Sequence, residues 1–229
     1  MSVSRRLTEL ASLVPRGARV CDIGTDHAWL PILLMREGIA THVIATDKRE
    51  KPLANAQKNI KFSGVPGIET RLGDGLSVID RGEADVIVIA GIGGEVISAI
   101  LSRCQWLNLP QSPVLILQPT TSPECLRRFL RSSGFAIEKE LPVEENGKLY
   151  SILRAVFTGK VALYEEWQDY IGGIDPANPA GRQYIQKQIC RLQTAARALI
   201  KIPARQEEGM CLQALAEKME HIIRNSGKA

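Results

Sequence analysis

Val20-Cys-Asp-Ile-Gly-Thr-Asp-His-Ala28 and the Thr46-Asp47 pair that follows one helix-length later predict the fold of this chain. Each stretch brings a short apolar run to an acidic residue, and the first continues through a glycine turn into a predicted helix. Gly24 has no Cβ, which lets the backbone come close to a ligand. Asp47 follows the turn by about 20 residues, where a carboxylate at a strand end can bind both hydroxyls of a ribose. The pattern therefore predicts a strand–helix–strand unit with a nucleotide site.

The composition of the turn indicates which class of nucleotide cofactor it suits. A dinucleotide fingerprint has three glycines, so that a helix N-terminus can receive a pyrophosphate, but only Gly24 is present here. Asp22, Asp26 and His27 surround it, and two carboxylates would repel a pyrophosphate. They suit a ligand with a cationic or zwitterionic end, such as S-adenosylmethionine. The alternative is that Gly24 only turns a strand into a helix.

Length, charge and cysteine content restrict the class of protein. The 229 residues suggest one full domain plus an appendage, and a net charge of +4 is compatible with a nucleic-acid partner without requiring one. The five cysteines form no Cys-x-x-Cys pair, so we expect neither a metal site nor a disulfide framework. The sequence has no leader-like start and no apolar run near ~18 residues. We therefore expect a cytoplasmic protein without a membrane partner.

Apolar runs and amphipathic stretches alternate along the first part of the chain. Strands are predicted at residues 19–23, 42–46, 68–72, 84–90, 114–117, 136–141 and 149–157. Helices are predicted at residues 4–14, 29–37, 52–62, 95–104 and 123–131. The last two strands flank Glu145-Asn-Gly-Lys148, a turn sequence typical of a hairpin. The predicted fold is α/β: a Rossmann-like three-layer sandwich with a mostly parallel sheet, strand 84–90 at its centre, and a terminal antiparallel hairpin.

Helical spacing replaces the strand pattern after Gly159. Leu163, Trp167 and Tyr170 predict a first short helix. Apolar residues then recur at steps of three and four in two stretches: Ile185, Ile189, Leu192, Ala196 and Leu199, and Leu212, Leu215, Met219 and Ile222. Such steps are typical of coiled-coil seams, and the separating segment 203–209 predicts an antiparallel pair. We expect a first domain at residues 1–159 and a helical, coiled-coil RNA-binding domain at residues 160–229.

The first helix of this pair has an uneven charge. Six basic residues lie between Arg182 and Arg205 inclusive, with no Asp or Glu among them. At 100° per residue, Lys187, Arg191 and Lys201 lie opposite the apolar seam. We predict that Arg182, Lys187, Arg191 and Lys201 form a solvent-facing stripe that binds nucleic-acid phosphates. The alternative is an ordinary solvated coiled-coil face.

The remaining candidate residues follow the predicted strands, at the edge where ligands bind in such sheets. Asp74 is placed to accept the exocyclic amine of an adenine, although an ordinary Asp-Gly turn is the alternative. Gly91 and Gly93 leave room for a flat base, unless they only allow close helix–strand packing. The predicted cofactor-binding residues are Asp22, Gly24, Thr25, Asp26, His27, Asp47, Lys48, Gly73, Asp74, Gly75, Ala90, Gly91 and Gly93.

Asp26, His27 and Trp29 are the candidates for catalysis. Asp26 could instead cap the following helix, His27 could only pack, and Trp29 could belong to the core. No Asn/Asp-Pro-Pro-aromatic clamp follows the fourth strand, and no proline–cysteine pair for covalent chemistry on pyrimidines is found there. A ring nitrogen with a free lone pair needs neither device, because it needs only to be held in line with the methyl group.

These motifs resemble the bacterial tRNA (adenine-N1)-methyltransferase family that modifies adenine 22 in the D-arm. The matching stretches are Asp22-Ile-Gly-Thr-Asp-His-Ala-Trp-Leu-Pro31, Ala45-Thr-Asp47, Gly73-Asp-Gly-Leu76, Ile89-Ala-Gly-Ile-Gly-Gly94, Leu117-Gln-Pro119 and Asn146-Gly-Lys-Leu-Tyr150. A methyltransferase domain followed by a helical extension matches as well, so the resemblance spans nearly the whole chain. The family more often has Tyr at the position of Trp29, which favours stacking as the role of this side chain.

The resemblance implies S-adenosylmethionine as cofactor, S-adenosylhomocysteine as product, tRNA as substrate and no metal. It also implies that Asp26, His27 and Trp29 line the methyl-transfer end of the site. The expected function is methyl transfer to N1 of adenine 22 by a monomer, with a dimer as the alternative. Other hypotheses are a methyltransferase acting on another RNA or base, and a non-catalytic tRNA-binding protein. A nicotinamide-dependent oxidoreductase is disfavoured by the missing glycines.

Overall fold

A seven-stranded sheet forms the centre of the protein in a computed structural model that describes residues 4–161 and 163–225, without the side chain of Asn225. The strand order is β3-β2-β1-β4-β5-β7-β6. The strands are β1 (Ala18–Ile23), β2 (Ala40–Asp47), β3 (Ile68–Leu72), β4 (Val86–Ile92), β5 (Val114–Pro119), β6 (Phe135–Glu145) and β7 (Lys148–Phe157). The first five run parallel, whereas β7 is antiparallel to both neighbours. The predicted sheet, with its central fourth strand and terminal hairpin, is confirmed.

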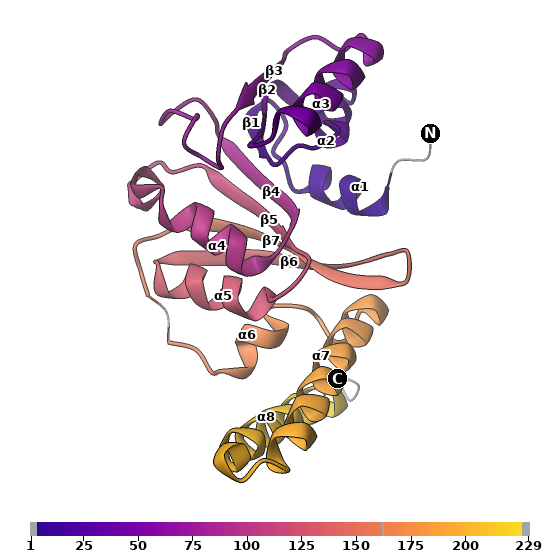
Figure 1. The fold of residues 1–229 in the computed structure, drawn as a ribbon, viewed down its shortest axis with the longest axis vertical. Helices are drawn as coiled ribbons and strands as arrows, with labels where there is room; N and C mark the ends of the chain where they lie inside the picture. The colour runs from indigo at the N-terminus through magenta and orange to yellow at the C-terminus, as the bar shows by residue number, and fades with distance from the viewer. Residues whose placement is uncertain (1–3, 162, 226–229) are drawn as a thin grey trace.

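Helices cover both faces of this sheet and make it a three-layer α/β fold (Figure 1). One face carries α1 (Arg5–Ser12), α2 (Trp29–Arg36) and α3 (Glu50–Ser63), and the other carries α4 (Gly94–Ser102), the 3-10 turn η1 (Gln105–Asn108) and α5 (Pro123–Ser132). The ends of the helices follow from local sequence. Gly64 ends α3 in the left-handed conformation (φ +67°), and Pro123 occupies the first turn of α5, where no backbone donor is lost.

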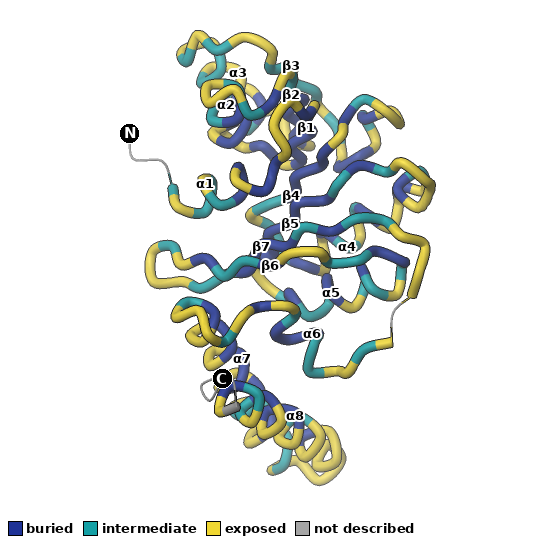
Figure 2. Tube along the Cα trace, turned by 180° about the vertical axis from the view of Figure 1, so that it is seen from behind, coloured by how far each residue is buried: buried dark blue, intermediate teal, exposed yellow. Residues whose placement is uncertain are grey.

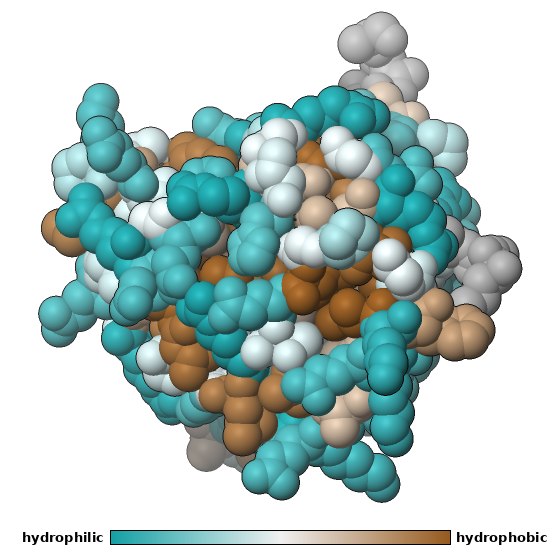
Figure 3. Space-filling model, turned by 90° about the horizontal axis from the view of Figure 1, so that it is seen from above, coloured by the Kyte–Doolittle hydropathy of each residue, from teal (hydrophilic) through white to brown (hydrophobic). Residues whose placement is uncertain are grey.

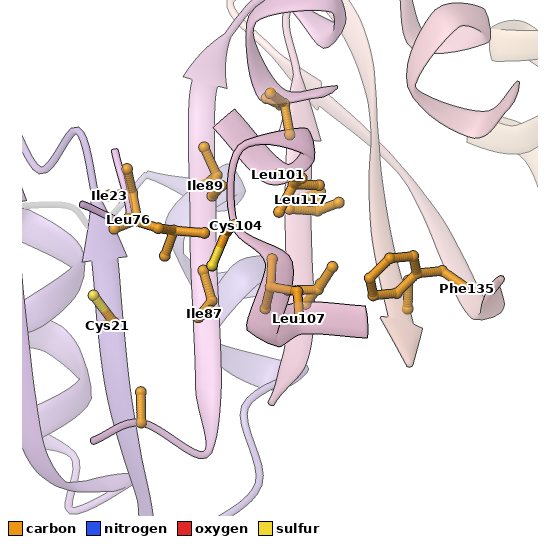
Figure 4. Packing of buried hydrophobic residues seen from close by; sticks show 14 of the residues in the cluster. Cys21, Ile23, Leu76, Ile87, Ile89, Leu101, Cys104, Leu107, Leu117 and Phe135 are labelled. Atoms are coloured by element: carbon orange, nitrogen blue, oxygen red, sulfur yellow. The ribbon is translucent and has the colours of Figure 1, made fainter. Parts of the chain in front are cut away.

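The core consists of two layers, one on each face of the sheet. Along β4 successive side chains point to opposite faces. Ile87 and Ile89 pack into one cluster with α4 and η1, as Figure 4 shows for Leu101 and Leu107. Val86 and Val88 pack into the other cluster, below α1 and α2. Figure 2 shows the resulting buried band along the central strands. A strand buried on both faces explains the continuous apolar run of the sequence.

The C-terminal part contains an antiparallel pair of long helices, α7 (Pro179–Ile200) and α8 (Gln206–Asn225). It also contains α6 (Trp167–Ile171) and the short turn η2 (Pro203–Arg205). The predicted seam is buried between the two long helices, for example at Ile185, Ile189 and Met219. Two details differ from the prediction. Leu163 lies outside α6 and is fully exposed. Gly209 lies within α8, and the absence of a side chain there lets α8 pack closely on α7, since a Cβ would lie 2.8 Å from Ile200.

A buried arginine connects α5 of the sheet region to the C-terminal helices. Arg127 donates from Nη1 to the carbonyl oxygens of Asp169 and Tyr170, and from Nη2 to the hydroxyls of Ser151 and Tyr184. This network joins residues on both sides of the predicted boundary between residues 159 and 160. The division into two domains stays a prediction. Residues 1–3, 162 and 226–229 of the predicted ranges lie outside the described residues.

The edge of the sheet at β3 is largely hydrophilic. Figure 3 shows this end of the molecule, over α2 and α3, with apolar side chains gathered in the middle of a hydrophilic surface. Phe62 at the end of α3 and Leu72 at the end of β3 are the large apolar residues of these elements that are most exposed. They lie outside the sheet core, and α3 packs mainly through Leu53 and Ala56.

Candidate active site

A cavity of about 600 Å³ opens at the carboxyl ends of β1, β2 and β4. Connections leave β1 and β4 in opposite directions, so this is the switch point where ligands bind in open α/β sheets. The predicted site residues that line it are Asp22, Gly24, Thr25, Asp26, His27, Trp29, Asp47, Lys48, Gly73, Asp74, Gly75, Ala90 and Gly91. Gly93 does not line it. It is the N-cap of α4, and a Cβ there would lie 2.9 Å from the Thr121 hydroxyl, so the packing explanation holds for this glycine.

The turn after β1 is held against the end of β2. The amides of Gly24 and Thr25 both donate to the carbonyl oxygen of Thr46, at 2.9 and 2.8 Å. Gly24, Asp26 and Ala28 all have positive φ, at +77°, +50° and +58°. For Asp26 and Ala28 this conformation carries strain, which is typical of functional turns. Ala28 is the N-cap of α2, so the alternative role of Asp26 as a helix cap is wrong.

Two carboxylates lie at the floor of the cavity. Asp22 and Asp47 are each only 5% exposed, and Asp47 Oδ1 accepts from the Arg49 amide at 2.9 Å. Burial, with the charge of Asp47 as a further cause, raises the pKa of Asp22 to about 6. The hydroxyl of Thr46 is buried here without a hydrogen-bond partner among the described residues, whereas the Thr25 hydroxyl faces the Asp22 carboxyl. Buried polar groups are normally paired, so this floor is built to receive a polar ligand.

Glycines and an ion pair form the end of the cavity near β3. Asp74 Oδ2 accepts from Arg103, the residue after α4, at 3.2 Å, and both side chains are largely exposed. A Cβ at Gly73 would lie 2.2 Å from Val78, and one at Gly75 would lie 2.9 Å from Ile100. These two glycines are therefore required by packing as well as by their place at the cavity.

Asp26, His27 and Trp29 lie together at the mouth of the cavity. His27 Nε2 is 3.5 Å from Asp26 Oδ2, and the rings of His27 and Trp29 stack at 6.3 Å between centroids. Trp29 is 40% exposed, so the alternative that it belongs to the core is wrong. Both polar side chains at this mouth are accessible to a substrate.

Helix α1 supplies a wall of the cavity that sequence reasoning missed. Arg6, Leu7 and Leu10 line it, and Arg6 bonds to Gln118 of β5 and Glu145 of β6. No local pattern could reveal these contacts, because they join positions more than a hundred residues apart. The stretch containing Gln118 was singled out only as part of the family resemblance.

The predicted basic stripe is exposed, but its side chains are not all directed to solvent. Arg191 pairs with Glu124 at 2.8 Å and lies over the ring of Tyr170. Lys187 Nζ donates to the Leu149 carbonyl of β7, and Arg182 donates to the carbonyl oxygens of Pro176 and Ile223. Lys187 and Arg191 are therefore solvent-exposed as predicted, but each also bonds to the sheet region, because α7 lies alongside it. Lys201 is exposed at the end of α7.

The described residues contain neither a metal-binding cluster nor a membrane-spanning helix. Across residues 4–161 and 163–225, no group of three or more His, Cys, Asp or Glu side chains could hold a metal ion. Within the same ranges, no helix combines the length and apolar character needed to cross a bilayer.

Comparisons with known proteins agree with the site geometry. A family model described as a methyltransferase domain matches residues 3–153. Over 166 residues the chain is 37% identical to the tRNA (adenine(22)-N(1))-methyltransferase of Bacillus subtilis, covering 72% of this chain and 69% of that protein. The crystal structure of the B. subtilis m1A22 tRNA methyltransferase has a TM-score of 0.82, 29% identity, and 98% coverage of both chains.

A structure solved in complex with a cofactor is also similar to this chain. The Streptococcus pneumoniae protein Sp1610, solved with S-adenosyl-L-methionine, has a TM-score of 0.83 and 32% identity, and the match covers 97% of this chain and 100% of that one. Sequence and fold therefore agree over nearly the full length described. The chain belongs to the methyltransferase-domain proteins and, among them, to the tRNA (adenine-22-N1)-methyltransferase family.

Proposed function

We propose that this protein transfers the methyl group of S-adenosylmethionine to N1 of adenine 22 in the D-arm of tRNA. The observation that carries the proposal is the Asp47 carboxylate at the end of β2, facing a cavity that extends to Asp26 and Trp29. The similarity to the B. subtilis enzyme supplies the acceptor. Membership of a methyltransferase family argues against the nicotinamide alternative.

The cavity fits S-adenosylmethionine in size and in polar groups. Its volume of about 600 Å³ lies within the usual range for small-ligand sites. Asp47 would accept from both ribose hydroxyls, because the Arg49 amide uses only one of the acceptor positions of its two oxygens and holds the side chain in place. Asp74 would accept a hydrogen bond from the exocyclic amine of adenine, and Thr25 would contact the amino-acid end beside Asp22. Gly24, Gly73, Gly75 and Lys48 complete the predicted cofactor contacts.

The strand order predicts which end of the cofactor lies at which strand. Asp74 follows β3, Asp47 ends β2, Gly24 follows β1, and Gly91 lies at the end of β4. With adenine and ribose at β3 and β2, the methyl group points toward β1 and β4. The target base would then lie between Ala90-Gly91 and the mouth formed by Asp26, His27 and Trp29.

The chemistry needs alignment and charge stabilisation rather than a general base. The sulfonium of S-adenosylmethionine supplies an activated methyl group, and adenine N1 has a free lone pair at neutral pH. The new N–C bond forms as the C–S bond breaks, so the thioether leaves and the base becomes cationic. Asp26 would stabilise that developing charge, His27 would hold Asp26 or the base edge, and Trp29 would stack on the extruded base.

We propose that tRNA binds along α7 through Arg182, Lys187, Arg191 and Lys201. Lys201 is exposed at the helix end, and the other three keep donors beyond their present contacts. Phosphate contacts of this kind hold an RNA by its shape and backbone. The proposal includes a monomer acting in the bacterial cytoplasm, where tRNA is found.

The test is methyl transfer from labelled S-adenosylmethionine to tRNA transcripts that differ only at position 22. We expect transfer to the transcript with adenine 22 and none to one with guanine 22, since guanine N1 carries a proton. N1-methyladenine cannot form a Watson–Crick pair, so reverse transcription should stop at position 22. Transfer at another position would contradict the assigned site. If protein that still binds the cofactor transfers no methyl group, the assignment of tRNA as substrate is wrong.

A further inference from the structure

Strands β4 and β5 lose their regular register at Gly91. Ala90 pairs with Gln118 and Ile92 pairs with Pro119, so Gly91 is an extra residue between two paired ones. Its φ of +81° is a left-handed conformation that glycine adopts without strain. Ala90, Gly91 and Ile92 all line the cavity, so this bulge shapes its wall at the end of β4.

The side chain of Gln118 supplies the hydrogen bond that the bulge lacks. Its Oε1 accepts from the Gly91 amide at 3.1 Å and from Arg6 Nη1 at 2.9 Å, and its Nε2 donates to the Pro119 carbonyl at 2.9 Å. Gln118 is 0% exposed. A buried carboxamide with partners for both oxygen and nitrogen is fixed in one orientation. Gly91 is therefore held by a side chain rather than by the strand ladder.

Arg6 is fixed in turn by the tip of the β6–β7 hairpin. Its Nε donates to Glu145 Oε2 at 3.0 Å, and the Ser4 hydroxyl also donates to Glu145. Although burial acts in the opposite direction, these two partners hold the pKa of Glu145 below its ordinary value. A Cβ on Gly91 would lie 3.5 Å from Arg6 Nη1, so the guanidinium lies against the bulge. Residues from α1, β5 and β6 thus converge on one glycine.

We propose that Gln118 and Arg6 are positioning residues for the methyl acceptor: they hold the Gly91 bulge as the wall against which the target base is aligned. This rests on the proposed function, which puts the base at the end of β4. The sequence after β4 has no Pro-Pro pair to stiffen this wall. The hydrogen bonds of Gln118 stiffen it instead. A displaced wall would misalign N1 with the C–S bond, and a shift of about 1 Å can cost roughly a hundredfold in rate.

The test compares Gln118→Met with Gln118→Glu. Methionine has a similar volume but cannot accept from Gly91 or Arg6. Glutamate loses the bond to the Pro119 carbonyl but keeps the acceptor for Gly91 and gains an ion pair with Arg6. We expect Gln118→Met to lower kcat about 30- to 100-fold, while KM for tRNA and Kd for S-adenosylmethionine stay within about threefold. Gln118→Glu should stay within about fivefold of the parent. Arg5→Met, an exposed neighbour on α1 outside the cavity lining, is the control and should match the parent.

Two outcomes would overturn the proposal. One is a Gln118→Met enzyme with kcat within about threefold of the parent, and the other is an equal loss of kcat in the methionine and glutamate variants. Should Gln118→Met fail to fold, Arg6→Met removes the anchor of Gln118 together with the ion pair to Glu145, and leaves the Gln118 bond to the Gly91 amide in place. We expect it to lower kcat about tenfold with KM unchanged, and an unchanged kcat would overturn the proposal as well.

A readout without substrate separates this proposal from the proposed function. The Gly91 amide should exchange its hydrogen at least about tenfold faster in Gln118→Met than in the parent or Gln118→Glu, as measured by NMR. Equal exchange in all three would show that Gln118 does not hold the bulge. Parent protein that methylates no tRNA would refute the proposed function, and the Gly91 exchange would still decide the role of Gln118.

Discussion

Arg127 and Glu140 form an ion pair inside the protein, with Arg127 Nε 2.9 Å from Glu140 Oε1 and side chains that are 0% and 1% exposed. Arg127 lies on α5 and Glu140 on β6. The second oxygen of Glu140 accepts from the Gly173 amide after α6. A Cβ at Gly172 would overlap this carboxylate, so the chain passes against it at a glycine. The pair therefore fixes the sheet region and the C-terminal helices to each other.

Replacing Arg127 by methionine should destabilise the protein strongly. The change leaves the Glu140 charge buried without its partner, which costs about 3–5 kcal/mol in comparable cases. Arg128→Met is a suitable control, since Arg128 pairs with Asp169 but its own side chain is 52% exposed. That variant should lose less than about 1 kcal/mol. Denaturant unfolding measures both, and equal losses would contradict the special role of Arg127.

Asp22 should make stability depend on pH. Its pKa in the folded protein is about 6, above its ordinary 3.8, so the stabilisation from protonation is complete below about pH 4 and lost as pH rises through 6. In cofactor-free protein, Asp22→Asn should therefore gain stability over the parent at pH 8, on the order of 2–3 kcal/mol, and lose this advantage below pH 4.

Asp85 provides the matched comparison for Asp22. Its hydrogen bond to Arg19 holds its pKa below the ordinary value, so its contribution is present above that value and lost as pH falls. The stability difference between Asp85→Asn and the parent should change with pH in the opposite direction. Unfolding curves between about pH 2 and pH 8 measure both variants, with the Asp85 effect appearing below about pH 4 and the Asp22 effect between about pH 4 and pH 7. A pH-independent difference for Asp22→Asn would contradict its raised pKa.

Asp47→Asn should weaken cofactor binding while preserving the fold. An asparagine oxygen can still accept from the Arg49 amide, but its NH₂ group then faces the ribose and cannot accept from the hydroxyls. We expect Kd for S-adenosylmethionine to rise about 30- to 100-fold by calorimetry, because a buried charged hydrogen bond is lost. A melting temperature near that of the cofactor-free parent would show that the effect is local. Unchanged affinity would exclude Asp47 from ribose binding.

Asp26→Asn tests whether the negative charge of the Asp26 carboxylate contributes to catalysis. Asparagine tolerates the left-handed conformation that Asp26 adopts, with φ +50°, so the turn should keep its shape. We expect kcat to fall about 10- to 100-fold at unchanged cofactor affinity, since the carboxylate stabilises charge only in the transition state. A kinetic series at saturating tRNA tests this. Equal kcat in the two proteins would remove Asp26 from catalysis and leave the fold assignment intact.

Lys201→Gln should weaken tRNA binding through the loss of one phosphate contact. The slope of log K against log salt should decrease by about one, with kcat at saturating tRNA unchanged. Lys218→Gln on α8 is the control, because Lys218 is paired with Glu165. Filter binding at several salt concentrations gives both slopes. If both variants keep the parental slope, tRNA does not bind at the end of α7.

The sequence predicted the sheet and most of the cavity correctly, because the signals involved are local. The apolar run of β4, the glycine turn after β1 and the Asn-Gly hairpin each depend on neighbouring residues. Where the sequence was incomplete, the missing information was contact between different elements. Gly209 lies in α8 where this helix packs against α7, and Lys187 and Arg191 bond to the sheet region although they are exposed.

The sequence by itself determined which strands exist, and that Asp47 and the Gly24 turn lie at one edge. Periodicity and turn chemistry act within a few residues, so a single stretch of chain contains the whole signal. Only the tertiary structure decided how Arg6 and Gln118 meet Gly91, and how Arg127 meets Glu140. These contacts depend on packing between elements far apart in the chain, and burial then makes each of their hydrogen bonds obligatory.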